Sequence, residues 1–87
     1  MFVILTYDVG VDRVNKIRKL LKKYLTWTQN SVFEGEITKG KLDKCLSEVE
    51  KIVDKNHDSI YIYTIRSTKF ISKNILGNEK SFDELFL

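Results

Sequence analysis

Met1-Phe-Val-Ile-Leu-Thr-Tyr-Asp8 is an apolar run that stops at a carboxylate, and it opens the chain. The run is rich in β-branched and aromatic residues, is too short for a helix, and is apolar at both sets of alternating positions. This pattern is typical of a strand that is covered on both faces. We therefore predict a first strand over Phe2–Tyr7.

After this run the apolar residues recur every three or four positions, which indicates an amphipathic helix. Asp12 is its expected N-cap. Its apolar positions are Val14, Ile17, Leu20, Leu21 and Tyr24. A second amphipathic helix is predicted further along, with Thr38 as its N-cap. Its apolar positions are Leu42, Cys45, Leu46, Val49, Ile52 and Val53.

Four further strands are expected, over residues 27–29, 31–37, 60–65 and 70–76. Asn30 is a natural bend between the first two of them. The resulting order, βαββαβ with an additional C-terminal strand, fits an α+β sandwich of the ferredoxin-like kind, in which both helices pack on one face of an antiparallel sheet. We expect a single such domain over residues 1–87, with a C-terminal tail from about residue 78.

The sheet of such a fold has a second face, which the helices leave uncovered. The first strand and the strand over 60–65 are each apolar on both faces, so the uncovered face carries apolar and aromatic side chains. A patch of that size is unusual on a monomer, and a chain of this length buries only about 60 to 65% of its unfolded surface. We therefore predict a homodimer in which a two-fold axis joins the two uncovered faces.

Asp8 ends the first strand beside this predicted interface. Two copies of its carboxylate near a two-fold axis would repel each other unless a proton or a cation lay between them. A hard divalent ion such as Mg²⁺ fits, with water and phosphate oxygens as its other ligands. The alternative is that Asp8 caps a helix or stabilises a turn, which is the commoner role of an aspartate at a strand end.

The positive charge concentrates in the first predicted helix. The chain has 15 Lys and Arg against 12 Asp and Glu, a net charge of +3 that permits a polyanionic partner without requiring one. Offsets of three and four residues place Lys16, Lys19 and Lys23 on one helix face, with Arg18 and Lys22 beside them. This stripe could follow a nucleic-acid backbone, or it could be the solvated side of an amphipathic helix.

Other chemistry finds little support in the sequence. Cys45 is the single cysteine and His57 the single histidine, so no zinc-ligand spacing occurs. A nucleophile elbow, a Walker loop and a dinucleotide-binding glycine motif are absent, which leaves metal-assisted hydrolysis. The chain shows no basic leader and no apolar run of membrane-spanning length, so a cytoplasmic location with no membrane partner is expected.

Four segments resemble one family, the small CRISPR-associated nucleases called Cas2. They are Val3-Ile-Leu-Thr-Tyr-Asp8-Val, Arg13-Val-Asn-Lys16, Gln29-Asn-Ser-Val-Phe-Glu-Gly35 and Ile62-Tyr-Thr-Ile-Arg-Ser67. The resemblance extends over nearly the whole chain, from Met1 to Lys80. Its most specific element is the combination of Tyr-Asp at the end of the first strand with Ser-Val-Phe-Glu-Gly in the centre.

The resemblance implies a ferredoxin-like homodimer in which the paired Asp8 residues bind Mg²⁺ or another divalent cation such as Mn²⁺. It also implies that Tyr7, Arg13 and Phe33 belong to the nuclease site, and that the protein is an endonuclease on single-stranded RNA or double-stranded DNA. The candidate nucleic-acid contacts are Arg13, Lys16, Arg18, Lys19 and Lys23.

The same family acts with the CRISPR integrase, Cas1, in the capture of new spacers. An alternative to the nuclease is therefore a non-catalytic dimeric DNA-binding adaptor that bridges integrase subunits and holds the prespacer duplex. The tail contains Phe82, Leu85 and Phe86, which a short helical turn would place on one side. We expect it to dock on either the other protomer or the integrase, and composition does not choose between them.

Overall fold

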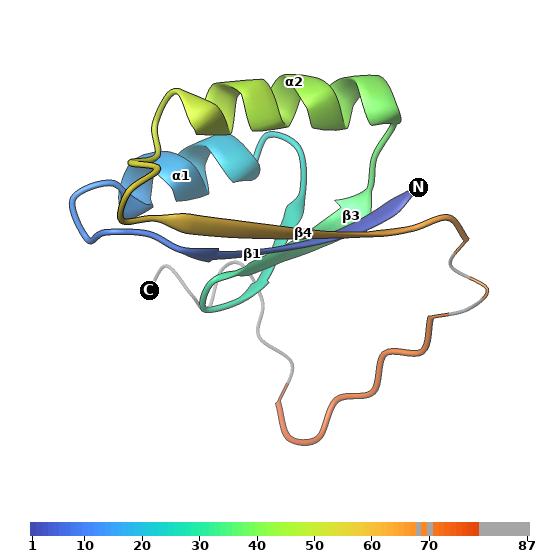
Figure 1. Ribbon diagram of the computed structural model, residues 1–87. Coiled ribbons are helices and arrows are strands. Elements are labelled where there is room, and N and C mark those ends of the chain that lie inside the picture. The colour runs from blue at the N-terminus through green and yellow to red at the C-terminus, as the bar shows by residue number, and fades with distance from the viewer. Residues whose placement is uncertain (68, 70, 79–87) are drawn as a thin grey trace.

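The computed structural model describes residues 1–67, 69 and 71–78 of the chain. In chain order its elements are β1 (Phe2–Asp8), α1 (Val14–Leu21), β2 (Thr26–Gln29), β3 (Val32–Glu36), α2 (Lys39–Glu50) and β4 (Ser59–Ile65). The strands form one antiparallel sheet in the order β2-β3-β1-β4, and both helices lie on the same face of it (Figure 1). This confirms the predicted α+β fold of the ferredoxin-like kind.

The core lies between the sheet and the two helices. Along β1 the side chains alternate, and Val3, Leu5 and Tyr7 are buried on the face that the helices cover. Leu5 lies opposite Phe33 of β3, which is also fully buried. The helices contribute the buried residues Ile17, Leu20, Leu21, Leu42, Cys45 and Val49. The spacing of apolar residues therefore predicted these buried positions correctly, although both helices end earlier than predicted. Tyr24, Ile52 and Val53 lie beyond the helix ends.

The two helix N-termini differ from each other. Thr38 is the N-cap of α2, and its Oγ1 accepts a hydrogen bond of 3.2 Å from the backbone N–H of Lys41, as predicted. Asp12 is not the N-cap of α1: that position belongs to Arg13, whose side chain makes no capping hydrogen bond. The Asp12 carboxylate instead accepts a hydrogen bond from Nη1 of Arg13 at 2.9 Å.

None of the helices in the described part of the chain is long and apolar enough to span a membrane.

Asn30 forms the predicted bend between β2 and β3. Its φ is 33°, in the left-handed region that asparagine tolerates better than most residues. Its carbonyl oxygen accepts hydrogen bonds from the indole N–H of Trp27, at 2.8 Å, and from the Tyr7 hydroxyl, at 3.2 Å. The bend therefore also anchors the end of β1.

The face of the sheet opposite the helices carries apolar and aromatic side chains, as the sequence predicted. Residues that pair directly across antiparallel strands point to the same side, so Ile4 and its partner Tyr63 lie together on this face. Tyr61 and Tyr63 are 57% and 54% exposed. The described residues leave this aromatic surface open to a partner, while the dimer itself stays a prediction.

The additional C-terminal strand predicted over 70–76 is not present in the described part of that segment. Residues 71–78 adopt no strand, and Phe70 lies outside the described residues. A strand requires an edge to pair with, and the described sheet contains only β1 to β4. Lys73 instead contacts β3 through an ion pair, with its Nζ 2.6 Å from a carboxylate oxygen of Glu34. The tail residues 79–87, with the three apolar positions predicted to dock, also lie outside the described residues.

Candidate functional site

Asp8 lies at the last position of β1, with an exposed side chain. The alternation along β1 places this side chain on the face that the helices do not cover, since Val3, Leu5 and Tyr7 point to the other. Among the described residues no donor hydrogen-bonds its carboxylate. An exposed carboxylate of this kind fits one ligand of a hard cation that keeps several waters.

A metal ion at this position would need ligands from outside the described chain. Within residues 1–67, 69 and 71–78, no group of three or more His, Cys, Asp or Glu side chains is arranged to hold a metal. Asp8 contributes a single carboxylate, and the remaining ligands would be water, phosphate oxygens or a second protein chain. The structure is thus compatible with the predicted shared site, and it does not offer a complete site within one chain.

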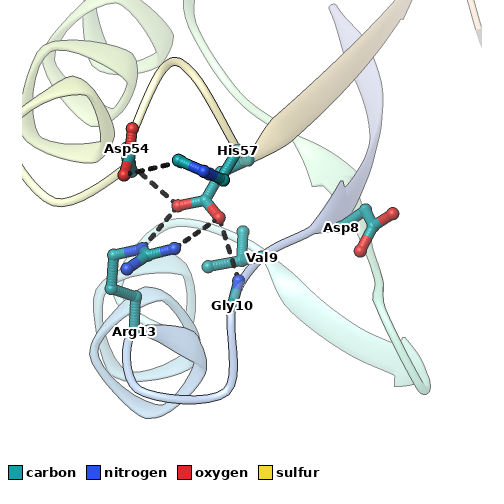
Figure 2. Close-up of a pocket in the computed structure, with 7 residues that line it drawn as sticks. Asp8, Val9, Gly10, Arg13, Asp54 and His57 are labelled. Atoms are coloured by element: carbon teal, nitrogen blue, oxygen red, sulfur yellow. Dashed lines mark hydrogen bonds and ion pairs between the residues drawn. The ribbon is translucent and has the colours of Figure 1, made fainter.

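Next to the end of β1 lies a hollow of about 470 Å³. It is lined by Asp8, Val9, Gly10, Arg13, Asp54, His57 and Asp58. Figure 2 shows the Asp8 carboxylate directed away from Arg13 and from the loop that carries Asp54 and His57. The structure therefore places Arg13 near Asp8 in the fold, yet their charged groups point in different directions.

The other charged groups of the hollow are organised around Asp58. Its side chain is only 1% exposed and accepts four hydrogen bonds. The Arg13 guanidinium donates two, from Nε at 2.6 Å and from Nη2 at 2.8 Å. The backbone N–H groups of Gly10 and Asp54 donate the others, at 2.9 and 2.8 Å. Every polar direction of this buried carboxylate is therefore satisfied, as burial of a charge requires.

These contacts shift the ionisation of both partners. The hydrogen bonds from Arg13 hold the pKa of Asp58 well below its usual range, and the backbone N–H groups of Asp54 and Gly10 act in the same direction. In return, the hydrogen bond to Asp58 raises the pKa of Arg13 further above its already high value. The shifts of the two pKa values therefore favour the ionised form of both side chains at neutral pH.

The Arg13 guanidinium closely approaches Gly10. A Cβ at Gly10 would lie 2.5 Å from Nη2 of Arg13 and 2.9 Å from a carboxylate oxygen of Asp12. Both distances are shorter than the contacts that real Cβ atoms make. A side chain at Gly10 would therefore push the guanidinium away from Asp58.

Tyr7 and Phe33 lie on the side of the sheet opposite Asp8. Phe33 is fully buried, and its ring stacks on Trp27 and tilts against Tyr7, with 6.1 Å between ring centroids in each pair. The Tyr7 hydroxyl donates to the Asn30 carbonyl and accepts a hydrogen bond of 3.1 Å from Nε of Arg18. The structure therefore does not bring these two predicted nuclease-site residues to Asp8. Their placement suits packing beneath the strand that carries it.

The basic residues of α1 and of the turn that follows it contact different neighbours. Lys16, Lys19 and Lys23 line a shallow groove of about 340 Å³, together with Leu20, Glu48 and Ile52. Arg18 lies elsewhere, with its guanidinium carbon 4.7 Å from the centroid of the Trp27 ring, and the Lys22 ammonium lies 5.4 Å from the same centroid. Burial, followed by repulsion from Arg18 and Lys19, lowers the pKa of Lys22. Arg18 and Lys22, predicted to lie beside the lysine stripe, both contact the Trp27 ring, and Lys22 stays close enough to Lys19 to be repelled by it.

Asp58 is the residue that sequence reasoning missed. Its partners Gly10 and Arg13 are 48 and 45 positions away, so no spacing rule connects them. The available signal was indirect: Asp58 lies two positions before the strand predicted over 60–65, and that strand pairs with the one that ends at Asp8. His57 is exposed, as expected of a lone histidine, and its Nδ1 lies 3.0 Å from the Asp54 carboxylate.

Comparisons with known proteins agree on one family. The family model described as "CRISPR associated protein Cas2" matches residues 1–72. The "CRISPR-associated endoribonuclease Cas2 3" of Thermodesulfovibrio yellowstonii is 56% identical over 79 residues, which is 91% of this chain and 90% of that protein. The "CRISPR-associated endoribonuclease Cas2" of Dictyoglomus turgidum is 45% identical over the full length of both chains.

A solved structure supports the same assignment. The structure described as "Crystal structure of cas2" superposes with a TM-score of 0.83 at 46% identity, and the match covers 93% of this chain and 91% of that one. Fold and sequence therefore point the same way. The chain belongs to the CRISPR-associated protein Cas2 family.

Proposed function

We propose that this protein is a metal-dependent endonuclease of CRISPR spacer acquisition, which acts in the cytoplasm on single-stranded RNA or double-stranded DNA. Its similarity to proteins named endoribonucleases, at 45 to 56% identity, supports a phosphodiesterase activity. The observation that carries the proposal is the position of Asp8. It is exposed at the end of β1, on the uncovered face of the sheet, and has no partner among the described residues.

In this proposal Asp8 holds Mg²⁺, or a similar ion such as Mn²⁺. When bound, such an ion polarises the scissile phosphate and lowers the pKa of a coordinated water. The protein's own contribution is to fix the direction of one carboxylate at the end of a strand. Tyr7 and Phe33 support that strand from beneath, and Arg13 stabilises the loop that follows it.

We propose further that two chains associate through their uncovered sheet faces. Ile4, Tyr61 and Tyr63 supply an apolar and aromatic surface there, and Asp8 lies at the end of the same face. A two-fold axis near the end of β1 would bring both Asp8 carboxylates to one cation, which would relieve their mutual repulsion. This arrangement provides the second protein ligand that one chain lacks.

Lys16, Lys19 and Lys23 are the proposed contacts to the nucleic-acid backbone. They line one groove of α1, and the acidic residue within it, Glu48, accepts a hydrogen bond of 3.0 Å from the Tyr24 hydroxyl. Lysine contacts to phosphates release counterions, so binding through this groove weakens as salt rises.

A second candidate function is the non-catalytic adaptor, which holds duplex DNA and binds the CRISPR integrase. One observation favours it: the lysine groove belongs to the helical layer, whereas Asp8 lies on the opposite face of the sheet. Binding of a duplex by the helices therefore does not need the Asp8 face. Both candidates use the same dimer.

The substitution Asp8→Asn separates the two candidates. It removes a charge without changing shape, so metal-dependent cleavage of a labelled RNA or DNA is abolished, while salt-sensitive duplex binding persists. Asp43→Asn is the matched control, since Asp43 is an exposed acid on α2 with 63% side-chain exposure. Cleavage that survives in Asp8→Asn, or in the unsubstituted protein with EDTA, would refute the nuclease proposal for this site.

A further inference from the structure

We propose that Asp58 is a positioning residue for the Asp8 centre. This inference rests on the proposed function of Asp8 and adds a residue that acts on it through the backbone. The Asp58 carboxylate joins the loop that leaves β1 to the loop that enters β4. By holding both loops together, Asp58 fixes the backbone at the end of β1 and with it the orientation of the Asp8 carboxylate.

The link from Asp58 to Asp8 is short on the side of β1. Oδ1 of Asp58 accepts the backbone N–H of Gly10 at 2.9 Å, and Gly10 lies two residues after Asp8. The path from the buried carboxylate to Asp8 therefore passes through two residues, Gly10 and Val9. Figure 2 shows this loop running from Asp8 through Val9 to Gly10, where the dashed line marks the hydrogen bond.

The link on the side of β4 is equally short. The Cα partner of Asp8 in the ladder is Ser59, which directly follows Asp58 in the chain. Asp58 therefore holds the backbone of Asp8 from two directions, through the sheet register and through the Gly10 N–H. Rotation of the strand end would have to break one of these connections.

Arg13 acts in this arrangement by holding Asp58. Its guanidinium donates from Nε and Nη2 to the two oxygens of Asp58, which fixes the plane of the carboxylate. The N–H of Asp54 holds the same carboxylate from the other loop. The backbone N–H of Arg13 donates to the Gly10 carbonyl at 2.9 Å, but its guanidinium makes no hydrogen bond to Gly10, so Asp58 is the residue that links this side chain to the Gly10 N–H.

Positioning matters here because each chain supplies one carboxylate. Mg²⁺ demands nearly ideal octahedral geometry at about 2.0–2.1 Å, and functional groups must be held to roughly 0.5 Å. Residues behind a metal ligand typically change metal affinity by about 10- to 100-fold when they are altered. A similar loss is expected when Asp58 releases the loop after Asp8.

The test is the substitution Asp58→Asn, with Mn²⁺ as the probe. Both oxygens of the Asp58 carboxylate accept hydrogen bonds from N–H donors. In Asn one oxygen is replaced by an NH₂ group, which cannot accept them, so the four hydrogen bonds cannot all persist. We expect the amide of Gly10 to lose protection from hydrogen exchange, as measured by NMR on the metal-free protein. We also expect the affinity for Mn²⁺, measured from the EPR signal of the free ion, to fall by about tenfold or more.

Val49→Ala is the matched control for lost stability. Val49 is 3% exposed on α2 and belongs to the helical layer, so its truncation lowers the melting temperature while Gly10 protection and Mn²⁺ affinity stay unchanged. Gly10→Ala is a second variant in case Asp58→Asn does not fold. It displaces the Arg13 guanidinium and leaves the charge of Asp58 in place, so a smaller loss of Mn²⁺ affinity is expected.

The outcomes separate this inference from the proposed function. If Asp8→Asn loses Mn²⁺ binding while Asp58→Asn keeps it, the Asp8 site stands and the positioning role of Asp58 is refuted. Unchanged Mn²⁺ affinity in Gly10→Ala refutes it in the same way if Asp58→Asn is unfolded. If the unsubstituted protein binds no Mn²⁺, or Asp8→Asn binds it equally well, both proposals fall together.

Discussion

Substitution of Phe33 tests whether this predicted nuclease-site residue touches the substrate itself or only supports β1, the strand that carries Asp8. Phe33 is fully buried and stacks on Trp27 with 6.1 Å between centroids. Truncation in Phe33→Ala removes most of a buried aromatic side chain and should cost about 3–5 kcal/mol of the free energy of unfolding. Phe33→Leu keeps a large apolar side chain and removes mainly the ring stacking, so about 1–2 kcal/mol is expected.

The two variants should therefore differ in stability and agree in activity where both are folded. Urea unfolding gives the free energies, and for a domain of this size each 1 kcal/mol lowers the melting temperature by roughly 4–8 °C. Cleavage is then measured at a low temperature at which Phe33→Leu is fully folded. We expect its rate to stay within a few-fold of the unsubstituted protein. A tenfold or larger loss of cleavage rate in folded Phe33→Leu would mean that the ring touches the reacting groups. Phe33 would then have to leave its buried position in the active state of the protein.

Three further predictions concern charge and association. Lys19→Glu should weaken nucleic-acid binding and reduce the slope of log K against log salt by about 0.9 for each phosphate that is no longer neutralised. Lys39→Glu on α2 should change neither the affinity nor the slope, and fluorescence anisotropy at several salt concentrations measures both. Equal effects of the two substitutions would mean that the lysine groove is only a solvated face. Because Arg13 lowers the pKa of Asp58 in the folded state, the ionised carboxylate stabilises the fold above its unfolded-state pKa of about 4, and this contribution is lost as the pH falls further. Thermal unfolding from pH 7 to pH 2 should thus show a steeper acid loss in the unsubstituted protein than in Asp58→Asn, and parallel curves would contradict the assignment. Tyr63→Glu should convert the dimer to a monomer in light scattering, while Val11→Glu, at a loop position that is 88% exposed, should not; a dimer that survives Tyr63→Glu would exclude this face.

The features that the sequence predicted correctly are those with local causes. The strands at 2–7 and 60–65 follow from β-branched and aromatic runs, and the cap at Thr38 follows from one hydroxyl and the helix beside it. The buried helix faces follow in the same way from their 3.6-residue period.

The features it missed depend on tertiary structure. Asp12 and Asp58 both look like local turn or cap residues, and only the packing of two loops makes Asp58 the partner of Arg13. The strand over 70–76 needs an edge that residues 71–78 do not meet in this chain. The position of Arg18 away from Lys16 follows from helix geometry alone, since at 100° per residue the two lie about 200° apart around the helix.

The central claim is that two chains share one cation through their Asp8 carboxylates. Titration of the protein with Mn²⁺, followed by EPR of the free ion and read against the protein concentration, gives the number of ions bound per chain. We expect one Mn²⁺ for every two chains, and no binding in Asp8→Asn. One ion for each chain, or binding that Asp8→Asn leaves unchanged, would contradict the shared site.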